Sequence, residues 1–434
     1  MKVLVIGGGG REHAIVWALR RSKRVSEVVC APGNAGIAAL ARCVPVSGGD
    51  LDAMVRVAEA EKPELVVVGP ELPLSLGLVD ELERRGMRVF GPTKAAARLE
   101  TSKAFAKQFM QRNQIPTAAY AVCTTLDEVR KELKRFSVPV VVKADGLAAG
   151  KGVVICATHE EAEQAAAEMF SGALLGTAER EVVIEEFLEG EEVSYFALCD
   201  GRHAVSLAAA QDHKRVGEGD TGPNTGGMGA YTADGLVSAE MMEWLRVNIA
   251  QRVVDEMAAE DTPFQGILFC GMMMSPRGPM VLEFNTRFGD PETEAILVRL
   301  ETDIAEMFGA AIDGRANEVA VRIRAGASVC VIAASGGYPG KYAQGLPIAG
   351  LDAAAAHQDV VVFHAGTALS EETGTDGAAV TAGGRVLAVT AVADASGPAM
   401  KSALVKAYGA MAKISFEGMQ YRRDIGWRAL RDGL

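Results

Sequence analysis

Short apolar runs alternate with amphipathic segments over the first hundred residues. Leu51, Met54, Val55 and Ala58 recur at the spacing of one buried helix face. Because strands and helices alternate, the pattern predicts a parallel sheet with crossover helices. We expect strands at 2–7, 26–33, 64–71 and 87–92, and helices from about residue 11, at 51–62 and at 75–86.

The middle of the chain predicts a different organisation. A long helix over 93–113 is followed by Pro116, and a smaller unit with two helices and three strands comes next. Thr158 and Glu161 have the spacing of a capping box at the second of these helices. Beyond it we expect a hairpin at 195–208, a long loop at 217–229, a helix at 238–260, a hairpin that ends at 280–285, and a helix at 293–313. From residue 328 onwards the chain is rich in strands and glycine, which indicates an α+β piece.

Composition narrows the class of protein. The 434 residues are 49% hydrophobic and 23% charged, which is typical of a globular chain, and the net charge of −12 disfavours nucleic acid binding by a general basic surface. The seven cysteines include no C-x-x-C pair, so we expect reduced thiols in a cytoplasmic protein. No signal peptide is recognisable, and no apolar run is long enough to span a membrane.

The glycines at 7–10 follow the first strand and open a helix, as in a dinucleotide-binding fingerprint. The fingerprint fails, because Glu12 and His13 occupy the two positions that its third glycine could take. The second strand also lacks a terminal acid for a ribose hydroxyl, which disfavours a nicotinamide enzyme. Backbone N–H groups at 8–11 could still bind a phosphate, and a plain tight turn is the alternative.

A second glycine-rich stretch runs from Lys143 to Gly152. Three residues separate Gly146 from Gly150, so the stretch is not a Walker A loop, and a strand follows it instead of a helix. We interpret it as a flexible flap whose Lys143 and Lys151 could close over a triphosphate. An exposed lysine hairpin is the alternative.

Two acidic segments could contact a nucleotide and its metal ion. At 184–192 several acids bracket Phe187 and Leu188, which could sandwich a flat base, although a solvated charge run fits this segment equally well. Glu283 and Asn285 lie on one face of a strand, about 6.6 Å apart along it, and suit Mg²⁺ shared with phosphate oxygens. The six histidines show no metal-ligand spacing, and only His213 is kept as a candidate for a pocket.

Together these segments resemble the phosphoribosylamine–glycine ligase family of the ATP-grasp superfamily. The resemblance extends from the first residues to Trp427, and its most specific parts are RFGDPETE at 287–294 and the loop that ends at Tyr231. It implies a mixed α/β and α+β fold with a parallel-sheet preATP-grasp domain (1–103), ATP-grasp A and B domains (104–325, with a flap subdomain at about 120–190) and a C-terminal α+β closing domain (326–434).

The resemblance also implies roles for single residues. ATP would contact Lys103, Lys143, Gly150, Lys151, Glu185, Phe187, Leu188 and Glu192. Glu283 and Asn285 would hold Mg²⁺ or Mn²⁺. Arg287, Lys143 and Asp290 would be catalytic. The substrates would contact Gly9, Gly10, Arg11, Asn34, Glu71, Asp212, Lys214 and Arg215. Many ATP-grasp enzymes supply a further acid about a dozen residues before the metal-binding glutamate, whereas Gly271 stands here, which leaves the number of metal ions open.

The implied reaction joins glycine to 5-phosphoribosylamine in purine biosynthesis. ATP would convert the glycine carboxylate to glycyl phosphate, and the amine would then displace phosphate, so no protein nucleophile is required. The rivals are another ATP-grasp carboxylate–amine ligase and a non-catalytic nucleotide-binding module, which the intact motifs disfavour. The expected partners are small molecules, with neither nucleic acid nor membrane, and the expected state is a monomer with a dimer as the alternative.

Overall fold

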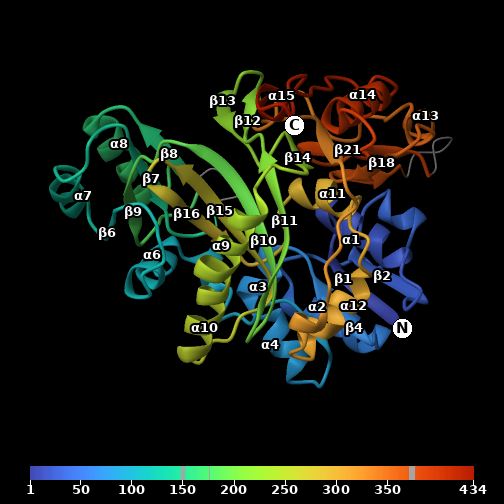
Figure 1. Ribbon diagram of the computed structural model, residues 1–434, viewed down its shortest axis with the longest axis horizontal. Helices are drawn as coiled ribbons and strands as arrows, with labels where there is room; N and C mark the ends of the chain where they lie inside the picture. The colour runs from blue at the N-terminus through green and yellow to red at the C-terminus, as the bar shows by residue number, and fades with distance from the viewer. Residues whose placement is uncertain (148–151, 175, 371–376) are drawn as a thin grey trace.

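The computed structural model describes residues 1–147, 152–174, 176–370 and 377–434. Its first sheet is parallel, as the alternation of the first hundred residues predicts, and has the strand order β3-β2-β1-β4-β5 (Figure 1). The strands are β1 (Lys2–Gly7), β2 (Glu27–Pro32), β3 (Arg42–Cys43), β4 (Leu65–Val68) and β5 (Val89–Phe90). The helices of this part are α1 (Gly10–Arg20), α2 (Leu51–Glu61), α3 (Glu71–Leu76) and α4 (Leu78–Glu83).

Alternate residues of β1 supply the cores on the two faces of this sheet. Val3 and Val5 pack in the cluster that includes Ile15 of α1, whereas Leu4 and Ile6 pack in the cluster that includes Met54 of α2. This alternation is the period of a strand that is buried on both faces. The carboxyl ends of the strands, where the glycine-rich segments lie, therefore face the rest of the molecule.

A second sheet of eight strands extends through the middle and the C-terminal part of the chain. Its order is β16-β15-β10-β11-β14-β17-β21-β18, and its neighbours pair antiparallel. The strands are β10 (Glu191–Asp200), β11 (Ala204–Asp212), β14 (Gly229–Ala233), β15 (Gln265–Ser275), β16 (Gly278–Asn285), β17 (Ala327–Ala334), β18 (Val360–His364) and β21 (Arg385–Ala393). Pairing of β14 with β17 makes the sheet continuous between the central and C-terminal segments.

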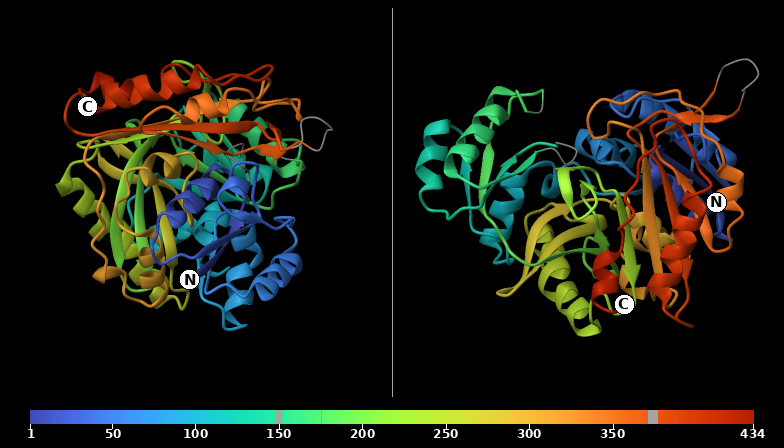
Figure 2. Two further views of the ribbon diagram at one scale, coloured as in Figure 1. Left: turned by 90° about the vertical axis from the view of Figure 1, so that its right-hand side faces the viewer. Right: turned by 90° about the horizontal axis from the view of Figure 1, so that it is seen from above.

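The flap unit is a separate four-stranded sheet with the order β6-β9-β7-β8. In Figures 1 and 2 it projects from the side of the molecule opposite the C-terminal segment. Thr158 caps its second helix, because its hydroxyl accepts from the backbone N–H of Glu161 as predicted. The elements are β6 (Tyr120–Cys123), α7 (Leu126–Leu133), β7 (Val140–Ala144), β8 (Val153–Cys156), α8 (His159–Ser171) and β9 (Val182–Glu186).

Two helices that we expected to be continuous are broken, and these predictions were wrong. The segment 93–113 forms α5 (Arg98–Thr101) and α6 (Lys103–Arg112), with an extended Ser102 between them. The Asp145 carboxylate accepts from the Ser102 hydroxyl (3.1 Å) and from the Ala104 N–H (2.7 Å), so a distant residue supports the break. The segment 293–313 forms α11 (Glu292–Leu297) and α12 (Ile304–Ile312), the second capped by Asp303.

The remaining elements connect these sheets. The helix expected at 238–260 forms, with a π-helical stretch (Arg246–Gln251) between α9 (Ala239–Leu245) and α10 (Arg252–Ala259). The long loop at 217–229 contains a small hairpin, which its composition did not predict. The other elements are η1 (Ile37–Ala39), β12 (Arg215–Gly217), β13 (Thr221–Asn224), η3 (Ala316–Glu318), α13 (Leu351–Ala355), β19 (Thr367–Leu369), β20 (Ala379–Thr381), α14 (Ala399–Met411) and α15 (Trp427–Arg431).

The C-terminal segment packs beside the N-terminal sheet, although the two are far apart in sequence (Figure 2). The backbone N–H of His364, at the end of β18, donates to Nδ1 of His13 in α1 at 2.7 Å. None of the helices in the described ranges combines the length and apolarity needed to cross a bilayer.

Candidate active site

A buried carboxylate between two lysines lies where the flap sheet meets the large sheet. Glu185 lies near the end of β9, and its two oxygens lie 2.9 Å from Nζ of Lys143 on β7 and 2.8 Å from Nζ of Lys107 on α6. All three side chains are at most 8% exposed. Burial opposes a charge on Glu185, but the two ammonium groups outweigh it and lower its pKa. The Lys143 ammonium also donates to the Leu282 carbonyl of β16 (3.2 Å).

Lys103 reaches the same region from the first turn of α6. Its ammonium donates to the Gly146 carbonyl (3.0 Å) at the start of the glycine-rich flap. The break at Ser102 makes this contact possible, because it places Lys103 beside Asp145 and Gly146. Burial lowers the pKa of Lys103, although Glu283 works against that shift. The segment 148–151, with the predicted ATP contacts Gly150 and Lys151, lies outside the described residues.

Glu283 and Asn285 stand at the end of β16, on the same face of the strand as predicted from their spacing. Lys214, which follows β11, donates to Glu192 at 2.7 Å, and its Nζ lies 4.0 Å from Oε1 of Glu283. Lys214 lowers the pKa of Glu192. Predicted metal, ribose and substrate residues thus lie together here.

Position 271 explains why a further acid is missing from this strand pair. Gly271 on β15 pairs directly with Glu283, and a Cβ at that glycine would lie 3.2 Å from Cγ of Glu283. A larger side chain at 271 would therefore crowd the glutamate. Within the described ranges, no three His, Cys, Asp or Glu side chains form a group that could hold a metal ion. A cation at Glu283 and Asn285 would take its remaining ligands from phosphate and water, which suits Mg²⁺.

Arg287 connects this strand end to the N-terminal sheet. Its guanidinium lies 2.8 Å from Glu100 and 3.3 Å from Glu71, and it donates to the Asn285 side-chain oxygen (3.2 Å). Burial raises the pKa of Glu100, although Arg287 opposes the shift. The backbone N–H and the hydroxyl of Thr286 both donate to the Glu100 carboxylate and hold it in place. Burial also opposes a charge on Glu71, but Arg287 and Arg11 outweigh it and lower its pKa to about 2.

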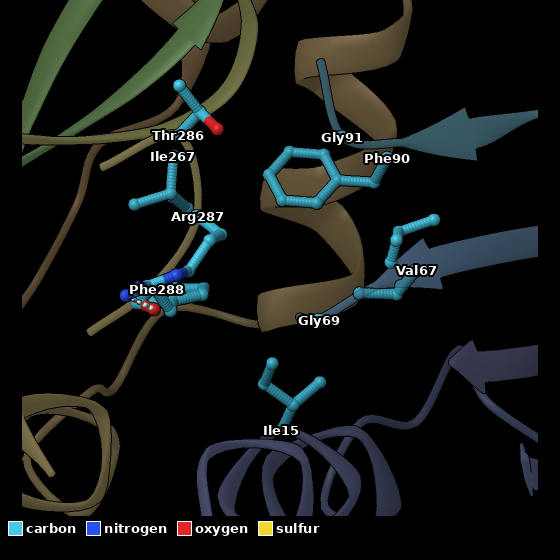
Figure 3. Close-up of a pocket in the computed structure, with 10 residues that line it drawn as sticks. Ile15, Val67, Gly69, Phe90, Gly91, Ile267, Thr286, Arg287 and Phe288 are labelled. Atoms are coloured by element: carbon cyan, nitrogen blue, oxygen red, sulfur yellow. Dashed lines mark hydrogen bonds between the residues drawn. The ribbon is translucent and has the colours of Figure 1, made fainter. Parts of the chain in front are cut away.

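Figure 3 shows Arg287 and Phe288 facing the ends of β4 and β5 across a narrow cavity. The cavity measures about 10 Å³, which is room for about one water molecule, and Gly69, Phe90 and Gly91 line its other side. It is therefore a seam between the N-terminal sheet and β16, too small for a substrate. A larger cleft of about 430 Å³ lies at the amino ends of the same sheet, away from the residues of the site.

The N-terminal side of the site is a closed network of charges. Arg11 is 6% exposed, lies 2.6 Å from Glu12 and 3.8 Å from Glu71, and donates to the Phe288 carbonyl at 3.1 Å. Glu12 also accepts from the Gly9 N–H (2.7 Å), and Asp290 accepts from the Arg11 N–H (3.5 Å). Carboxylates thus take two of the N–H groups that we expected to bind phosphate.

Two further acids face this helix start. Glu294 is fully buried, and a Cβ at Gly10 would lie 2.3 Å from its Oε1, so a larger residue there would displace the Glu294 carboxylate. Neither Glu294 oxygen has a hydrogen-bond partner among the described residues, and burial raises the pKa of Glu294 well above the ordinary value. Asp290 lies 3.1 Å from Arg385 of β21, whose guanidinium also donates to the Asp290 and Gly226 carbonyls. Arg385 thus joins the C-terminal segment to two loops of the site.

Asp212 carries a side-chain oxygen that has no hydrogen-bond partner in the described part of the chain, next to Gly227. Burial, followed by Glu292, raises its pKa well above the ordinary value. Phe187 is exposed whereas Leu188 is buried, so the two side chains that were expected to sandwich a base differ in access. Asp212 and Phe187 are thus available for a ligand.

Three candidates have structural partners instead. The Asn34 amide donates to the Gly8 and His364 carbonyls, so it fastens the N-terminal sheet to the C-terminal segment. Arg215 donates to the Gly222 carbonyl within the β12–β13 hairpin. His213 is fully buried and accepts from the Gly426 N–H (3.0 Å), so it does not line a pocket and that expectation was wrong.

Sequence reasoning missed the partners that hold the predicted residues. These are Glu12, Glu100, Lys107 and Arg385. Only Lys107 had a signal, because it follows Lys103 by four residues and lies on the same helix face. The others are single charges whose partners are adjacent or far away in the chain, which no spacing reveals.

Comparisons with known proteins match the whole of this arrangement. The family model described as phosphoribosylglycinamide synthetase, ATP-grasp (A) domain, matches residues 101–293. The models for the N and C domains of the same synthetase match 1–100 and 328–428.

Relatives of known name agree with these models. A phosphoribosylamine–glycine ligase of Xanthomonas axonopodis is 48% identical over 99% of this chain and 98% of its own length. One from Salmonella typhimurium is 46% identical over 99% of both chains. The crystal structure of a phosphoribosylamine–glycine ligase from Thermotoga maritima is 36% identical and has a TM-score of 0.81, over 98% of this chain and all of that one. The biotin carboxylase domain of a Hydrogenobacter thermophilus 2-oxoglutarate carboxylase, solved with MgADP, shares the fold at 17% identity and a TM-score of 0.73, over 100% and 95% of the two chains.

Proposed function

The chain belongs to the phosphoribosylamine–glycine ligase family, and from this premise we propose how its own residues join glycine to 5-phosphoribosylamine. It is an ATP-grasp ligase of purine biosynthesis that forms a carbon–nitrogen bond. The observation that carries the proposal is that Lys143 and Lys214 both reach the end of β16, at the Leu282 carbonyl and at Glu283, where Arg287 contacts Asn285.

In our proposal ATP lies between the flap sheet and β16. Lys103 and Lys143 bind its phosphates, because both ammonium groups lie at the flap and Lys143 contacts the β16 backbone. The adenine lies against Phe187 and Leu188, and the ribose lies near Glu192. Support comes from Lys107 and Lys143, which share the single carboxylate of Glu185, so that a polyphosphate would balance the second ammonium group.

Glu283 and Asn285 would hold Mg²⁺ or Mn²⁺ at the terminal phosphates. The pair fits such an ion, because both side chains supply hard oxygens from one face of a strand. When bound, the cation neutralises the charge of the phosphate oxygens. Lys214 assists by placing a further positive charge 4.0 Å from Glu283.

Arg287, which Glu71 and Glu100 hold beside Asn285, then orients the glycine carboxylate at the γ-phosphate through the part of its guanidinium that faces the end of β16. A carboxylate oxygen attacks phosphorus, the bond to the β-phosphate oxygen breaks, and glycyl phosphate and ADP form. The amine of phosphoribosylamine next attacks the carbonyl carbon, and inorganic phosphate leaves with the activated oxygen as the amine releases a proton. Catalysis consists of alignment and charge neutralisation, so no protein nucleophile is needed.

The sugar phosphate lies over the ends of β1 and β4 in this proposal. Glu71 is the ribose contact, because its carboxylate is ionised, about one third exposed and held between Arg11 and Arg287. All of these groups come from one chain, so we propose the monomer as the active unit. All seven cysteines are free, which supports a reducing cytoplasm.

Isotope transfer tests the mechanism. Glycine labelled with ¹⁸O in its carboxylate is incubated with ATP, Mg²⁺ and phosphoribosylamine, and the products are analysed by mass spectrometry. We expect ADP and inorganic phosphate that carries one labelled oxygen. Unlabelled phosphate, or AMP with pyrophosphate, would contradict the acyl phosphate route. A parallel reaction without phosphoribosylamine measures background hydrolysis of ATP.

A further inference from the structure

Lys107 has no part in the chemistry described so far, yet it is among the most buried charged residues of the chain. It lies on α6 and is 2% exposed. Its ammonium lies 2.8 Å from Oε2 of Glu185 and donates to the Thr117 hydroxyl (2.7 Å). That hydroxyl donates to the Val281 carbonyl of β16 (2.6 Å). Lys107 thus connects Glu185 of the flap sheet to β16, the strand that ends in Glu283 and Asn285.

The groups around Lys107 leave one positive charge without a partner. Glu185 is the only carboxylate in contact with the Lys107 and Lys143 ammonium groups among the described residues. Glu186 on β9 points elsewhere, to the Ala119 N–H and to Arg277, and Tyr120 on β6 offers only its ring face, 6.0 Å from Nζ. A buried charge without a partner is costly, so this cluster is suited to an incoming anion.

We propose that Lys107 is a positioning residue for nucleotide binding, which keeps Glu185 neutralised when Lys143 turns from Glu185 to the phosphates. The proposal rests on the nucleotide site proposed above. With Lys107 present, Lys143 can leave without stranding a buried carboxylate. Without Lys107, the same movement would leave the Glu185 carboxylate buried and unpaired, which is energetically unfavourable. ATP would then have to compete with Glu185 for Lys143.

The titration of Lys107 supplies a signature that a merely structural residue lacks. Burial lowers the pKa of Lys107 to about 8, although Glu185 opposes the shift and Lys143 adds to it. Above this pH Lys107 loses its proton and no longer supplies the positive charge that neutralises Glu185. The KM for ATP should therefore rise above about pH 8, whereas the KM for phosphoribosylamine should not. Lys103 also has a lowered pKa, so the variants below separate the two lysines.

The test compares Lys107→Met with Lys107→Arg in the full-length enzyme. Lys107→Met should raise the KM for ATP by about 10- to 100-fold, the usual effect of removing a group that orients a ligand-binding residue, and leave the KM for phosphoribosylamine within about twofold. Lys107→Arg keeps the charge and has no pKa in this range, so the KM for ATP should stay low and lose its rise above about pH 8. Adding Glu185→Gln to Lys107→Met should lower the KM for ATP relative to Lys107→Met alone, because no carboxylate then holds Lys143.

Other results would overturn the proposal. One is a rise in the KM for both ATP and phosphoribosylamine with Lys107→Met. Another is a rise in the KM for ATP that is as large with Lys107→Arg as with Lys107→Met. A third is a KM for ATP that still rises above about pH 8 in Lys107→Arg. If Lys107→Met fails to fold, as thermal unfolding would show, the pH profiles of the wild type and Lys107→Arg still decide. Failure of the proposed function is distinguishable, because it would appear as absence of glycine-dependent ADP formation in the wild type.

Discussion

The two sides of the site differ in how their charges are balanced. On the flap side Lys107 and Lys143 share one carboxylate, Glu185, and the Lys103 ammonium donates to a backbone carbonyl instead of a carboxylate. The charged groups of this side are Lys103, Lys107, Lys143, Lys214, Asp145, Glu179, Glu185, Glu192 and Glu283. On the N-terminal side every arginine already has a carboxylate partner. Glu294 forms no ion pair with any of them among the described residues. Its charged groups are Arg11, Arg287, Arg385, Glu12, Glu71, Glu100, Asp290 and Glu294.

This difference shows what each side is built to receive. Two buried ammonium groups that share one carboxylate favour a polyanion, because the second positive charge is balanced only when the ligand binds. A network of paired arginines is complete without a ligand, so it fixes the shape of the surface on which a sugar and an amine are held. The contrast also disfavours Arg11 as a phosphate contact, because its guanidinium already contacts Glu12, Glu71 and the Phe288 carbonyl.

The largest expected effect is on the stability of the N-terminal network. Arg11→Met leaves Glu12 buried without its ionic partner, and breaking a buried pair in this way costs about 3–5 kcal/mol of unfolding free energy. Lys103→Met, on the flap side, removes one hydrogen bond and should cost about 1 kcal/mol. Urea unfolding monitored by circular dichroism measures both. Equal losses would mean that the two sides do not differ in this way.

The next effect is on turnover. Glu283→Gln keeps the volume of the side chain but removes a charge from the proposed metal site, so kcat should fall on the order of 10²–10³-fold while the thermal midpoint stays unchanged. Glu189→Gln, an exposed acid of the neighbouring acidic segment, is the matched control and should keep full activity. Turnover that is unaffected by Glu283→Gln at limiting Mg²⁺ would contradict the assignment.

Much of this contrast was accessible from the sequence wherever short-range patterns decide the structure. The strand period placed Glu283 and Asn285 on one face, and the helix period identified the buried face that includes Met54. The cap of α8 followed from Thr158. These features depend on residues that are near in sequence, so spacing and propensity are sufficient to find them.

Features that depend on distant partners were not accessible. The helix break at Ser102 is supported by Asp145, and the pairing of Arg385 with Asp290 spans most of the C-terminal part of the chain. Ser102 caps α6, because its hydroxyl accepts from the Phe105 N–H (3.0 Å), but a serine within the helical pattern of 93–113 does not by itself predict a break. The position of Lys103 at the flap, which depends on that break, was therefore predicted only through resemblance.

A smaller effect concerns the joint between the N-terminal sheet and the C-terminal segment. Burial, followed by the neighbouring imidazole of His364, lowers the pKa of His13 to about 3, and the neutral Nδ1 accepts from the His364 N–H. In the unfolded chain His13 binds its proton below its ordinary pKa of 6.5, so this contribution is complete above that pH and is lost as the pH falls towards 3. Between about pH 7 and pH 5 the loss should be about 2 kcal/mol.

His13→Asn tests this joint, since its side-chain oxygen can replace Nδ1 as the acceptor and does not titrate. The difference in unfolding free energy between the wild type and this variant should shrink or reverse as the pH is lowered. A difference that is independent of pH would show that His13 does not stay neutral in the folded enzyme. His364, whose pKa burial lowers to about 4, contributes in both proteins and cancels in the comparison.

The smallest effect should come from Glu71, at the boundary between the two sides. Glu71→Gln keeps the hydrogen-bonding shape but removes the charge that lies between Arg11 and Arg287. If Glu71 contacts the ribose, the KM for phosphoribosylamine should rise about tenfold, the value of one hydrogen bond to a charged group, while the KM for ATP changes less than about twofold. Since its pKa is about 2, the Glu71 carboxylate stays ionised at neutral pH, and the ratio of wild-type to variant KM should be flat between about pH 6 and pH 9. Equal rises in both KM values would indicate that Glu71 acts only through Arg287, and would place the sugar elsewhere on the N-terminal side.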